Sequence, residues 1–190
     1  NTSIININDE KHYILVIQDI SEFKNSEETM NKIAFKDHLT GLNNRVSFNL
    51  AVEKLISDNV NKFGVIFLDL DYFKVINDTL GHTIGDKLLI KVGKRIQDCL
   101  GSHDFLARLG GDEFVILVAR PFSYDKCRDI CNCILEMIKR PFIIENHEVY
   151  IGSSIGVSIY PEDGTTKEDL VKAADIAMYK AKDFSRNYAC

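Results

Sequence analysis

The chain has 190 residues, with 23 Lys and Arg against 28 Asp and Glu for a formal net charge of −5, and 45% of its residues are hydrophobic. This composition excludes a largely disordered chain, and the length suffices for one domain with a sizeable core plus an appended segment. The mild acidity disfavours a nucleic-acid or anionic-membrane binder, because those partners attract basic surfaces. With no signal peptide and no apolar run of the ~20 residues that span a membrane, we expect a soluble domain without membrane contact.

The first 36 residues differ in pattern from the rest. Residues 12–17 are apolar and rich in β-formers, which predicts a last strand with no sheet before it and indicates that the chain is cut from something longer. Residues 22–37 are charged and contain no Gly or Pro, and Phe23, Met30 and Ile33 have heptad-like spacing. We therefore expect a remnant of an upstream domain over 1–20, a helical linker over 21–36 and the main domain over 37–190.

The main domain alternates helical and strand patterns. Apolar periodicity predicts helices over 45–58, 86–100 and 124–139, and strands over 63–68 and 149–160, with a short strand over 142–144. The runs 105–109 and 114–118 predict a hairpin across Gly110-Gly111. Thr165-x-x-Glu168 has capping-box spacing and predicts the start of a last helix. This order predicts an α+β fold with one mixed, mainly antiparallel sheet flanked by helices.

Five cysteines are present: Cys99, Cys127, Cys131, Cys133 and Cys190. An odd number without framework spacing favours a reducing cytosol over a secreted disulfide scaffold, so a cytoplasmic location is expected, with membrane tethering through an upstream region left open. Cys127 and Cys131 share a helical stripe with apolar residues, and cysteine serves as a small core hydrophobe. Core packing is therefore favoured over metal binding for the cysteine cluster at 127–133.

Two acidic clusters follow strand-like runs. Asp69-Leu70-Asp71 comes directly after 63–68, and its carboxylates share a face if the strand continues; Asp112-Glu113 follows the glycine turn. Each cluster alone is equally consistent with a solvated turn. Brought together, these carboxylates would repel unless cations lay among them, and oxygen ligands suit Mg²⁺ bound together with substrate phosphates.

The segment 72–86, between the clusters, has the residue types of a nucleotide site. Lys74 can offset phosphate charge, while Asn77 and Asp86 are acceptors for a base that carries N–H donors. On physical grounds, a Mg²⁺-nucleotide site is one interpretation of this region.

The segment 108–114, Arg-Leu-Gly-Gly-Asp-Glu-Phe, resembles the signature of the GGDEF family, the diguanylate cyclases. Four further stretches resemble family motifs in the same order: Asp37-His38-Leu39-Thr40-Gly41-Leu42-Asn43-Asn44-Arg45, Asp69 to Asp86, Ser154-Ile155-Gly156-Val157, and Ala173 to Lys182. The resemblance runs from about residue 37 to 187, and residues 10–21 resemble the tail of a PAS sensor domain. The resemblance implies a palm-like α+β fold similar to that of nucleotidyl cyclases. It also implies an enzyme that condenses two GTP molecules into cyclic di-GMP and two pyrophosphates.

The resemblance also implies roles for individual residues. Asp112 and Glu113 would be catalytic, with Mg²⁺, or Mn²⁺ in its place, held by Asp69, the Leu70 carbonyl, Asp112 and Glu113. Glu113 would serve as a metal ligand or as a base for the 3′-hydroxyl. The residues expected to bind substrate are Asn77, Asp86 and His82 at the guanine, and Lys74, the Tyr72-Phe73 backbone, Gly110, Gly111, Lys182 and Arg186 at the phosphates.

Two positions depart from the family pattern. Ser185 stands where the family usually has glycine before the arginine at 186. Many members carry Arg-x-x-Asp before the glycine turn as a product-binding inhibitory site. Here the stretch is Gly101-Ser102-His103-Asp104, so the aspartate remains but the arginine is absent, and we expect this inhibitory site to be degenerate.

The resemblance leaves open how the domain is used. An active cyclase would work as a homodimer, with each 3′-hydroxyl attacking the α-phosphate of the partner's GTP. The alternatives are a silent GTP-binding module that regulates a neighbouring domain and a dimerising transmission module. An upstream sensor is expected, and Arg140-Pro141-Phe142 and Ser158-Ile159-Tyr160-Pro161 resemble GGDEF domains that precede a phosphodiesterase EAL domain. No nucleic-acid partner is expected.

Overall fold

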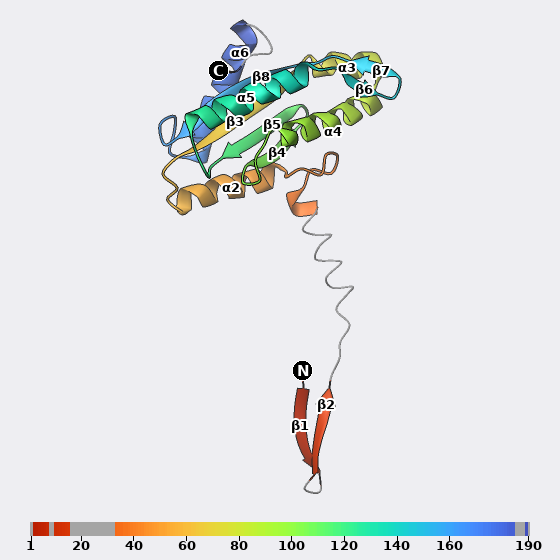
Figure 1. The fold of residues 1–190 in the computed structure, drawn as a ribbon, viewed down its shortest axis with the longest axis vertical. Coiled ribbons are helices and arrows are strands. Elements are labelled where there is room, and N and C mark those ends of the chain that lie inside the picture. The colour runs from red at the N-terminus through yellow and green to blue at the C-terminus, as the bar shows by residue number, and fades with distance from the viewer. Residues whose placement is uncertain (1, 8–9, 16–32, 185–188, 190) are drawn as a thin grey trace. The chain divides into compact units, whose positions relative to one another are not determined.

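The computed structural model describes residues 2–7, 10–15, 33–184 and 189, which divide into one unit up to Ala34 and a second unit from Phe35 (Figure 1). In the first unit, β1 (Thr2–Ile7) and β2 (Glu10–Leu15) pair as an antiparallel hairpin. The prediction of a strand with no sheet before it is therefore wrong, because β1 precedes that strand and pairs with it. Of the expected linker over 21–36, residues 21–32 lie outside the described residues, and 33–35 are helical.

The second unit contains a four-stranded antiparallel sheet in the order β4-β5-β3-β8. Its strands are β3 (Phe63–Asp71), β4 (Phe105–Gly110), β5 (Glu113–Val118) and β8 (Gly152–Tyr160). The predicted hairpin across the glycine turn is confirmed as β4–β5. The long β3 lies between β5 and β8, so the turn and the end of β3 reach the same edge of the sheet.

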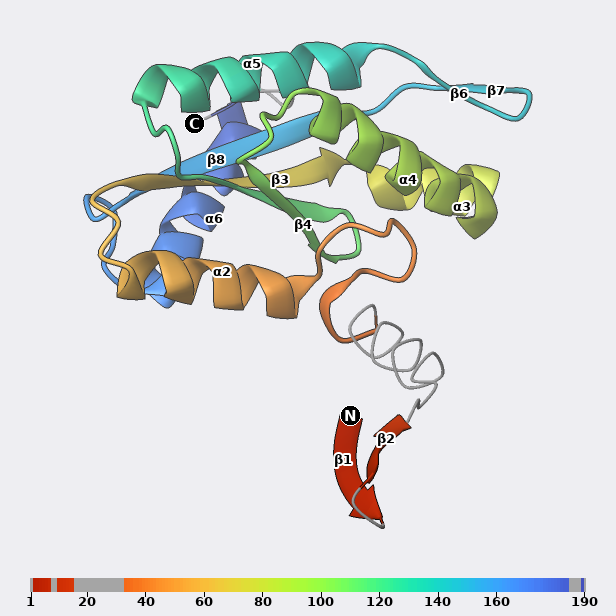
Figure 2. The same cartoon turned by 60° about the horizontal axis from the view of Figure 1, so that its bottom comes forward.

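Helices cover both faces of this sheet (Figure 2). One face carries α4 (His82–Asp98) and α5 (Tyr124–Lys139), and the other carries α2 (Arg45–Ser57) and α6 (Lys167–Phe184). Side chains of β3 alternate between two hydrophobic clusters: Leu68 and Leu70 belong to the cluster with α4 and α5, whereas Val65 and Phe67 belong to the cluster with α2 and α6. By this alternation, Asp69 and Asp71 fall on the α2–α6 side, which confirms that they share a face.

Several element boundaries differ from the prediction. The sequence analysis did not predict α3 (Phe73–Leu80), which is separated from α4 by Gly81 at a φ of 86°. The predicted short strand over 142–144 is confirmed as β6 (Phe142–Ile144), which forms a small separate hairpin with β7 (His147–Val149). The predicted strand over 149–160 is divided between β7, which ends at Val149, and β8, which begins at Gly152. The cap of α6 lies one residue later than predicted, because the Asp169 amide donates to Thr166 Oγ1 at 3.2 Å and Thr166 Oγ1 donates to the Asp169 carboxylate at 2.7 Å.

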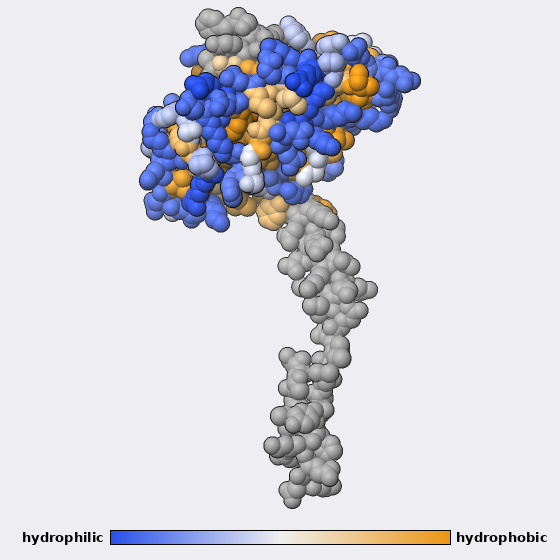
Figure 3. Space-filling view, in the orientation of Figure 1, coloured by the Kyte–Doolittle hydropathy of each residue, from blue (hydrophilic) through white to orange (hydrophobic). Residues whose placement is uncertain are grey.

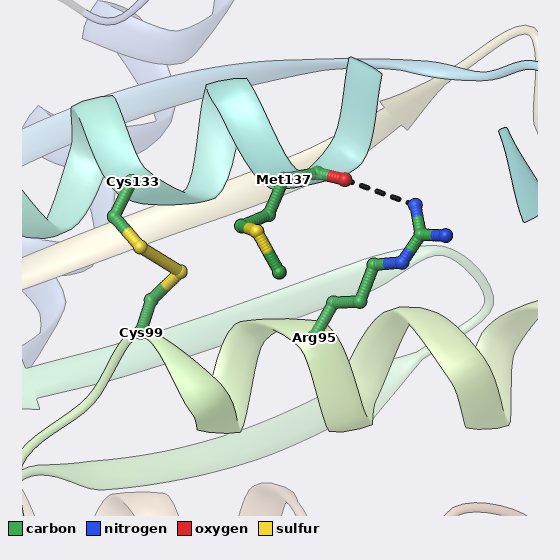
Figure 4. Close-up of a disulfide and its surroundings, with 4 residues drawn as sticks. All are labelled: Arg95, Cys99, Cys133 and Met137. Atoms are coloured by element: carbon green, nitrogen blue, oxygen red, sulfur yellow. Dashed lines mark hydrogen bonds between the residues drawn. A yellow bond between two sulfur atoms is a disulfide. The ribbon is translucent and has the colours of Figure 1, made fainter. Parts of the chain in front are cut away.

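The cysteines do more than fill the core. Cys99, at the C-terminal end of α4, and Cys133 of α5 form a disulfide with a Cα–Cα distance of 5.9 Å (Figure 4). The sequence analysis did not predict this disulfide, because only the packing of α4 beside α5 brings together two cysteines that are 34 residues apart. Cys127 and Cys131 are free thiols buried on the inner stripe of α5, as predicted, and Cys190 lies outside the described residues.

Apolar side chains are concentrated inside the second unit. The face of this unit in Figure 3 is largely hydrophilic and is interrupted by small hydrophobic areas.

Arg95 of α4 joins α4 to α5 near the disulfide, because its guanidinium donates to the backbone carbonyl of Met137 at 2.9 Å (Figure 4). Among the described residues, no helix is both long enough and apolar enough to cross a lipid bilayer.

Candidate functional site

The two acidic clusters meet where β3 ends beside the β4–β5 turn. Asp69 and Glu113 are direct partners in the antiparallel register of β3 and β5, so their side chains project from the same face of the sheet. Gly110 and Gly111 have φ angles of 140° and 52°, which side-chain-bearing residues rarely adopt. The two glycines thus let the chain turn sharply and present Asp112 beside Asp69.

The environment of this edge raises the pKa of two of its carboxyl groups, Asp112 and Glu113. Burial raises the pKa of Asp112 above its ordinary value, as does the charge of Asp69, whereas Lys182 and Arg108 act in the opposite direction. Burial likewise raises the pKa of Glu113, and the charges of Asp69 and Asp112 add to the rise while Arg45 opposes it. A site with this much negative charge favours the binding of cations.

Lys182 reaches this edge from α6. Its ammonium group lies 2.7 Å from Asp69 Oδ1, and the side chains of the two residues are 28% and 16% exposed. The helix can pack closely on β8 because Gly156 has no side chain. A Cβ at this position would overlap the backbone of Ala174 and Met178 in α6. The structure therefore brings Lys182 to the site, whereas Arg186 lies outside the described residues.

Two arginines hold the turn itself, and the sequence analysis gave neither a role. Arg45, the first residue of α2, donates to the Leu109 carbonyl at 3.3 Å and lies 3.4 Å from the Glu113 carboxylate. Arg108 donates to the Gly111 carbonyl at 2.7 and 3.0 Å. Both residues belong to motifs in the sequence, but a motif does not show that two distant segments meet at one turn.

The predicted guanine site lies in α3 and α4. The amide of Asn77 packs against Gly85, where a Cβ would overlap Asn77 Oδ1, so Asn77 lies beside the residue that precedes Asp86. Asp86 and His82 are exposed in the first two turns of α4. The two acceptors expected for guanine thus come from neighbouring positions of two packed helices, with His82 one turn before Asp86 on α4.

The predicted phosphate site begins directly after β3. Tyr72 has a φ of 60° and precedes α3, whose N-terminus carries no side-chain cap. Phe73 and the exposed Lys74 form the first turn of this helix. Backbone amides at an uncapped helix N-terminus, next to a lysine, can bind anionic oxygens.

The donor set is compatible with a hard divalent cation. Carboxylate and carbonyl oxygens from Asp69, Leu70 and Asp112 are the ligand types that Mg²⁺ and Mn²⁺ prefer, and Lys182 already places a positive charge on Asp69. Within the described part of the chain, no group of three or more His, Cys, Asp or Glu side chains is arranged to hold a metal, and the Glu113 carboxylate is turned toward Arg45. The residues therefore suit a cation that brings further oxygen ligands with it, as a nucleotide-bound Mg²⁺ does.

Asp104, the aspartate of the expected degenerate inhibitory site, makes contacts within the fold. The Asp104 side chain is fully buried and lies 2.6 Å from Lys126 Nζ of α5, and its other oxygen accepts from the Gly101 amide at 2.9 Å. Asp104 is thus engaged on both oxygens within the fold.

Comparison with known proteins gives a family match over most of the chain. The family described as "Diguanylate cyclase, GGDEF domain" matches residues 34–188. The bifunctional diguanylate cyclase/cyclic di-GMP phosphodiesterase MucR of Pseudomonas aeruginosa is 42% identical over 162 residues, which cover 84% of this chain and 24% of MucR. The cyclic di-GMP phosphodiesterase PdeR of Escherichia coli is 39% identical over 174 residues, which cover 90% of this chain and 26% of PdeR. The chain spans about a quarter of the length of these curated relatives.

Solved structures show the same fold. The GGDEF domain of PA1120 (YfiN or TpbB) from Pseudomonas aeruginosa has a TM-score of 0.76 and 36% identity, covering 79% of this chain and 96% of that chain. A sensory box/GGDEF family protein from Caulobacter crescentus has a TM-score of 0.71 and 39% identity, covering 79% of this chain and 99% of that chain. The similarity therefore includes nearly all of each known domain.

Proposed function

Because the chain belongs to the GGDEF family of diguanylate cyclases, we propose that it condenses two molecules of GTP into cyclic di-GMP and two molecules of pyrophosphate. The observation that carries this proposal is the turn that places Asp112 and Glu113 beside Asp69 and Lys182 at one edge of the sheet. Phosphoryl transfer needs little covalent help from a protein but much positioning and charge neutralisation. This edge supplies carboxylates for a cation and a lysine for phosphate oxygens.

Each step of the proposed reaction requires a role that residues of this edge can fill. The 3′-hydroxyl of each GTP attacks the α-phosphate of the other, so that two new P–O bonds form and one pyrophosphate leaves from each nucleotide. Asp69, the Leu70 carbonyl and Asp112 would hold Mg²⁺, or Mn²⁺ in its place, which when bound neutralises phosphate charge. Lys182 and Lys74 bind phosphate oxygens. Glu113 accepts the proton of the hydroxyl, a task that its raised pKa favours.

Recognition of the base falls to α3 and α4. Guanine carries the N1–H and N2–H₂ donors, and Asn77 and Asp86 provide acceptors from neighbouring positions of two packed helices. His82 supports this pocket from the first turn of α4. Specificity then arises because a site that makes hydrogen bonds rejects a base that cannot make them.

Catalysis requires a homodimer in this proposal. Each chain carries one set of the proposed substrate residues, whereas the reaction joins two nucleotides. Two protomers must therefore face each other with one GTP apiece. We also propose that residues 1–20 belong to a sensor domain and that 21–36 link it to the GGDEF domain.

A catalytically silent, GTP-binding regulatory module is the second candidate function. The names of several relatives favour it, since PdeR of Escherichia coli, PdeB of Shewanella oneidensis and NbdA of Pseudomonas aeruginosa are called cyclic di-GMP phosphodiesterases. In this candidate function the chain would bind GTP and regulate a neighbouring domain without making cyclic di-GMP. Against this candidate, the Gly-Gly-Asp-Glu-Phe segment, Asp69, Asn77 and Asp86 are all intact in this chain.

Analysis of the reaction products separates the two candidates. The protein is incubated with GTP and Mg²⁺ over a range of protein concentrations, and the nucleotides are resolved by anion-exchange chromatography. Cyclic di-GMP should accumulate, and the rate per protomer should rise with concentration as dimers form. GTP binding without product, in the presence of dimers, would support the regulatory module instead.

A further inference from the structure

The ion pair between Lys182 and Asp69 joins two residues that have different partners during the proposed reaction. Lys182 Nζ lies 2.7 Å from Asp69 Oδ1. In the proposed function, Asp69 binds the divalent cation and Lys182 binds phosphate. The observed contact opposes these roles, because an ammonium group at hydrogen-bond distance from one carboxylate oxygen repels a divalent cation held by the same carboxylate.

We propose that Lys182 is an exchangeable cation, which neutralises Asp69 until a divalent cation arrives with a nucleotide and which then transfers to the phosphates. This inference rests on the proposed function and concerns the order in which its ligands bind. A free metal ion must displace Lys182 and leave the ammonium group without its carboxylate. A metal ion that arrives with nucleotide phosphates supplies new oxygen partners for the displaced lysine, so metal and nucleotide should bind cooperatively.

The neutralising role follows from the charges at this edge. Asp69 raises the pKa of Asp112 and Lys182 lowers it, so the three groups interact electrostatically. Nη1 of Arg108 donates to both carboxylate oxygens of Asp37, and Nη2 of the same residue donates to the Gly111 carbonyl, while Arg45 is turned toward Glu113. Among the ion pairs of the described residues, the one with Lys182 is the pair that neutralises Asp69.

The exchange requires movement of one side chain only. Helix α6 is anchored by buried small residues, since Ala174 and Ala181 are fully buried against the sheet. Lys182 is 28% exposed and carries its ammonium group on a flexible four-carbon stem. The ammonium group can therefore leave Asp69 without displacement of the helix, which an arginine held in a bidentate contact could not do as readily.

Metal binding in the absence of nucleotide tests the proposal directly. Mn²⁺ alone is titrated into the wild type and into Lys182→Gln, with free Mn²⁺ measured by electron paramagnetic resonance. Removal of the competing ammonium group should tighten Mn²⁺ binding by a factor of about 1.5 to 5, the range expected for loss of a partly exposed ion pair. Affinity for GTP without metal should fall in the same variant.

Lys180→Gln is the matched control, because it makes the same change in charge on an exposed residue of the same helix. It should leave Mn²⁺ affinity near the wild-type value, and Asp69→Asn should abolish the binding. Equal or weaker Mn²⁺ binding by Lys182→Gln, relative to the wild type, would overturn the exchange. The Mn²⁺ affinities do not depend on whether the protein makes cyclic di-GMP. A cyclase assay without product would therefore overturn the proposed function, whereas only the affinities can overturn the exchange.

Discussion

The carboxylate of Asp37 accepts two hydrogen bonds from Nη1 of Arg108, at 2.9 and 3.0 Å, across 71 residues of sequence. Both side chains are largely buried, with exposed fractions of 11% and 9%. The same guanidinium donates through Nε and Nη2 to the carbonyl of Gly111. The first loop of the domain is thereby tied to the turn that presents Asp112 and Glu113.

Replacement of Asp37 should destabilise the domain in a manner that depends on pH. Burial alone would raise the pKa of Asp37, but hydrogen bonds from Thr40 and the charge of Arg108 hold the pKa below its ordinary value of 3.8. The stabilisation is therefore complete above about pH 5 and is lost as pH falls through the lowered pKa. Asp37→Asn should cost about 1–3 kcal/mol of unfolding free energy at pH 7, measured with urea.

Two comparisons make the Asp37 experiment decisive. The difference between wild type and Asp37→Asn should shrink when unfolding is measured below pH 4. The exposed Asp98→Asn should change the unfolding free energy by less than about 0.5 kcal/mol. A loss of unfolding free energy in Asp37→Asn that stayed constant from pH 7 to pH 3 would show that the lowered pKa of Asp37 does not stabilise the fold.

The turn carboxylates should be dispensable for folding and required for synthesis. Asp112→Asn and Glu113→Gln each remove a charge from the site, and each should lower the rate of cyclic di-GMP formation at least about 100-fold. Because the pKa of each carboxyl is raised in the fold, neutralisation should not reduce stability. The measurements are product formation and the thermal unfolding midpoint, and near-normal activity in both variants would refute the catalytic assignment.

Guanine selectivity should depend on Asp86. Adenine lacks the N1 proton and the N2 amine, so ATP would leave the acceptors of Asp86 and Asn77 without donors. We expect kcat/KM for GTP to exceed that for ATP at least about 100-fold, and Asp86→Ser to reduce this ratio. Asp98→Ser, at the other end of α4, is the control and should leave the ratio unchanged; equal use of ATP by the wild type would exclude the assignment.

Product inhibition through Asp104 should be absent. Both oxygens of Asp104 are engaged, one by Lys126 and one by the Gly101 amide, and the arginine of the family motif is replaced by glycine. Micromolar cyclic di-GMP should therefore not slow the reaction. Asp104→Ala should instead lower the unfolding free energy by about 2 kcal/mol, since it leaves Lys126 without its carboxylate.

A double-mutant cycle distinguishes the structural role of Asp104 from a regulatory one. The double variant Lys126→Met/Asp104→Ala should lose less unfolding free energy than the two single variants together. In the double variant, neither the carboxylate nor the ammonium group remains buried without its partner. Inhibition by cyclic di-GMP that disappears in Asp104→Ala would show that this prediction is wrong.

The disulfide between Cys99 and Cys133 should stabilise the oxidised protein. It closes a loop across 34 residues and restricts the unfolded chain, an effect of about 2–4 kcal/mol. Dithiothreitol should lower the unfolding free energy of the wild type by that amount. Cys133→Ser should match the reduced wild type and should not respond to dithiothreitol, and a wild type indifferent to the reductant would contradict the expectation.

Local patterns in the sequence determined most of the secondary structure. Apolar spacing located α2, α5 and β3, and the glycine pair located the β4–β5 turn, because helix and strand periodicity depend on neighbouring residues. The same reasoning missed α3, a helix of eight residues that Gly81, at a φ of 86°, separates from α4. It also placed the cap of α6 at Thr165 instead of Thr166, since both threonines offer a hydroxyl near an acid and only the backbone path selects one.

Resemblance to the family indicated which residues belong to the site, and only the tertiary structure decided how they contact one another. The contacts of Asp37 with Arg108, of Lys182 with Asp69 and of Cys99 with Cys133 join segments that are distant in the chain. No local pattern encodes them, because each depends on how helices pack on the two faces of the sheet and on the register of its strands. Sequence thus determined the elements and the inventory of charges, and packing determined which charge neutralises which.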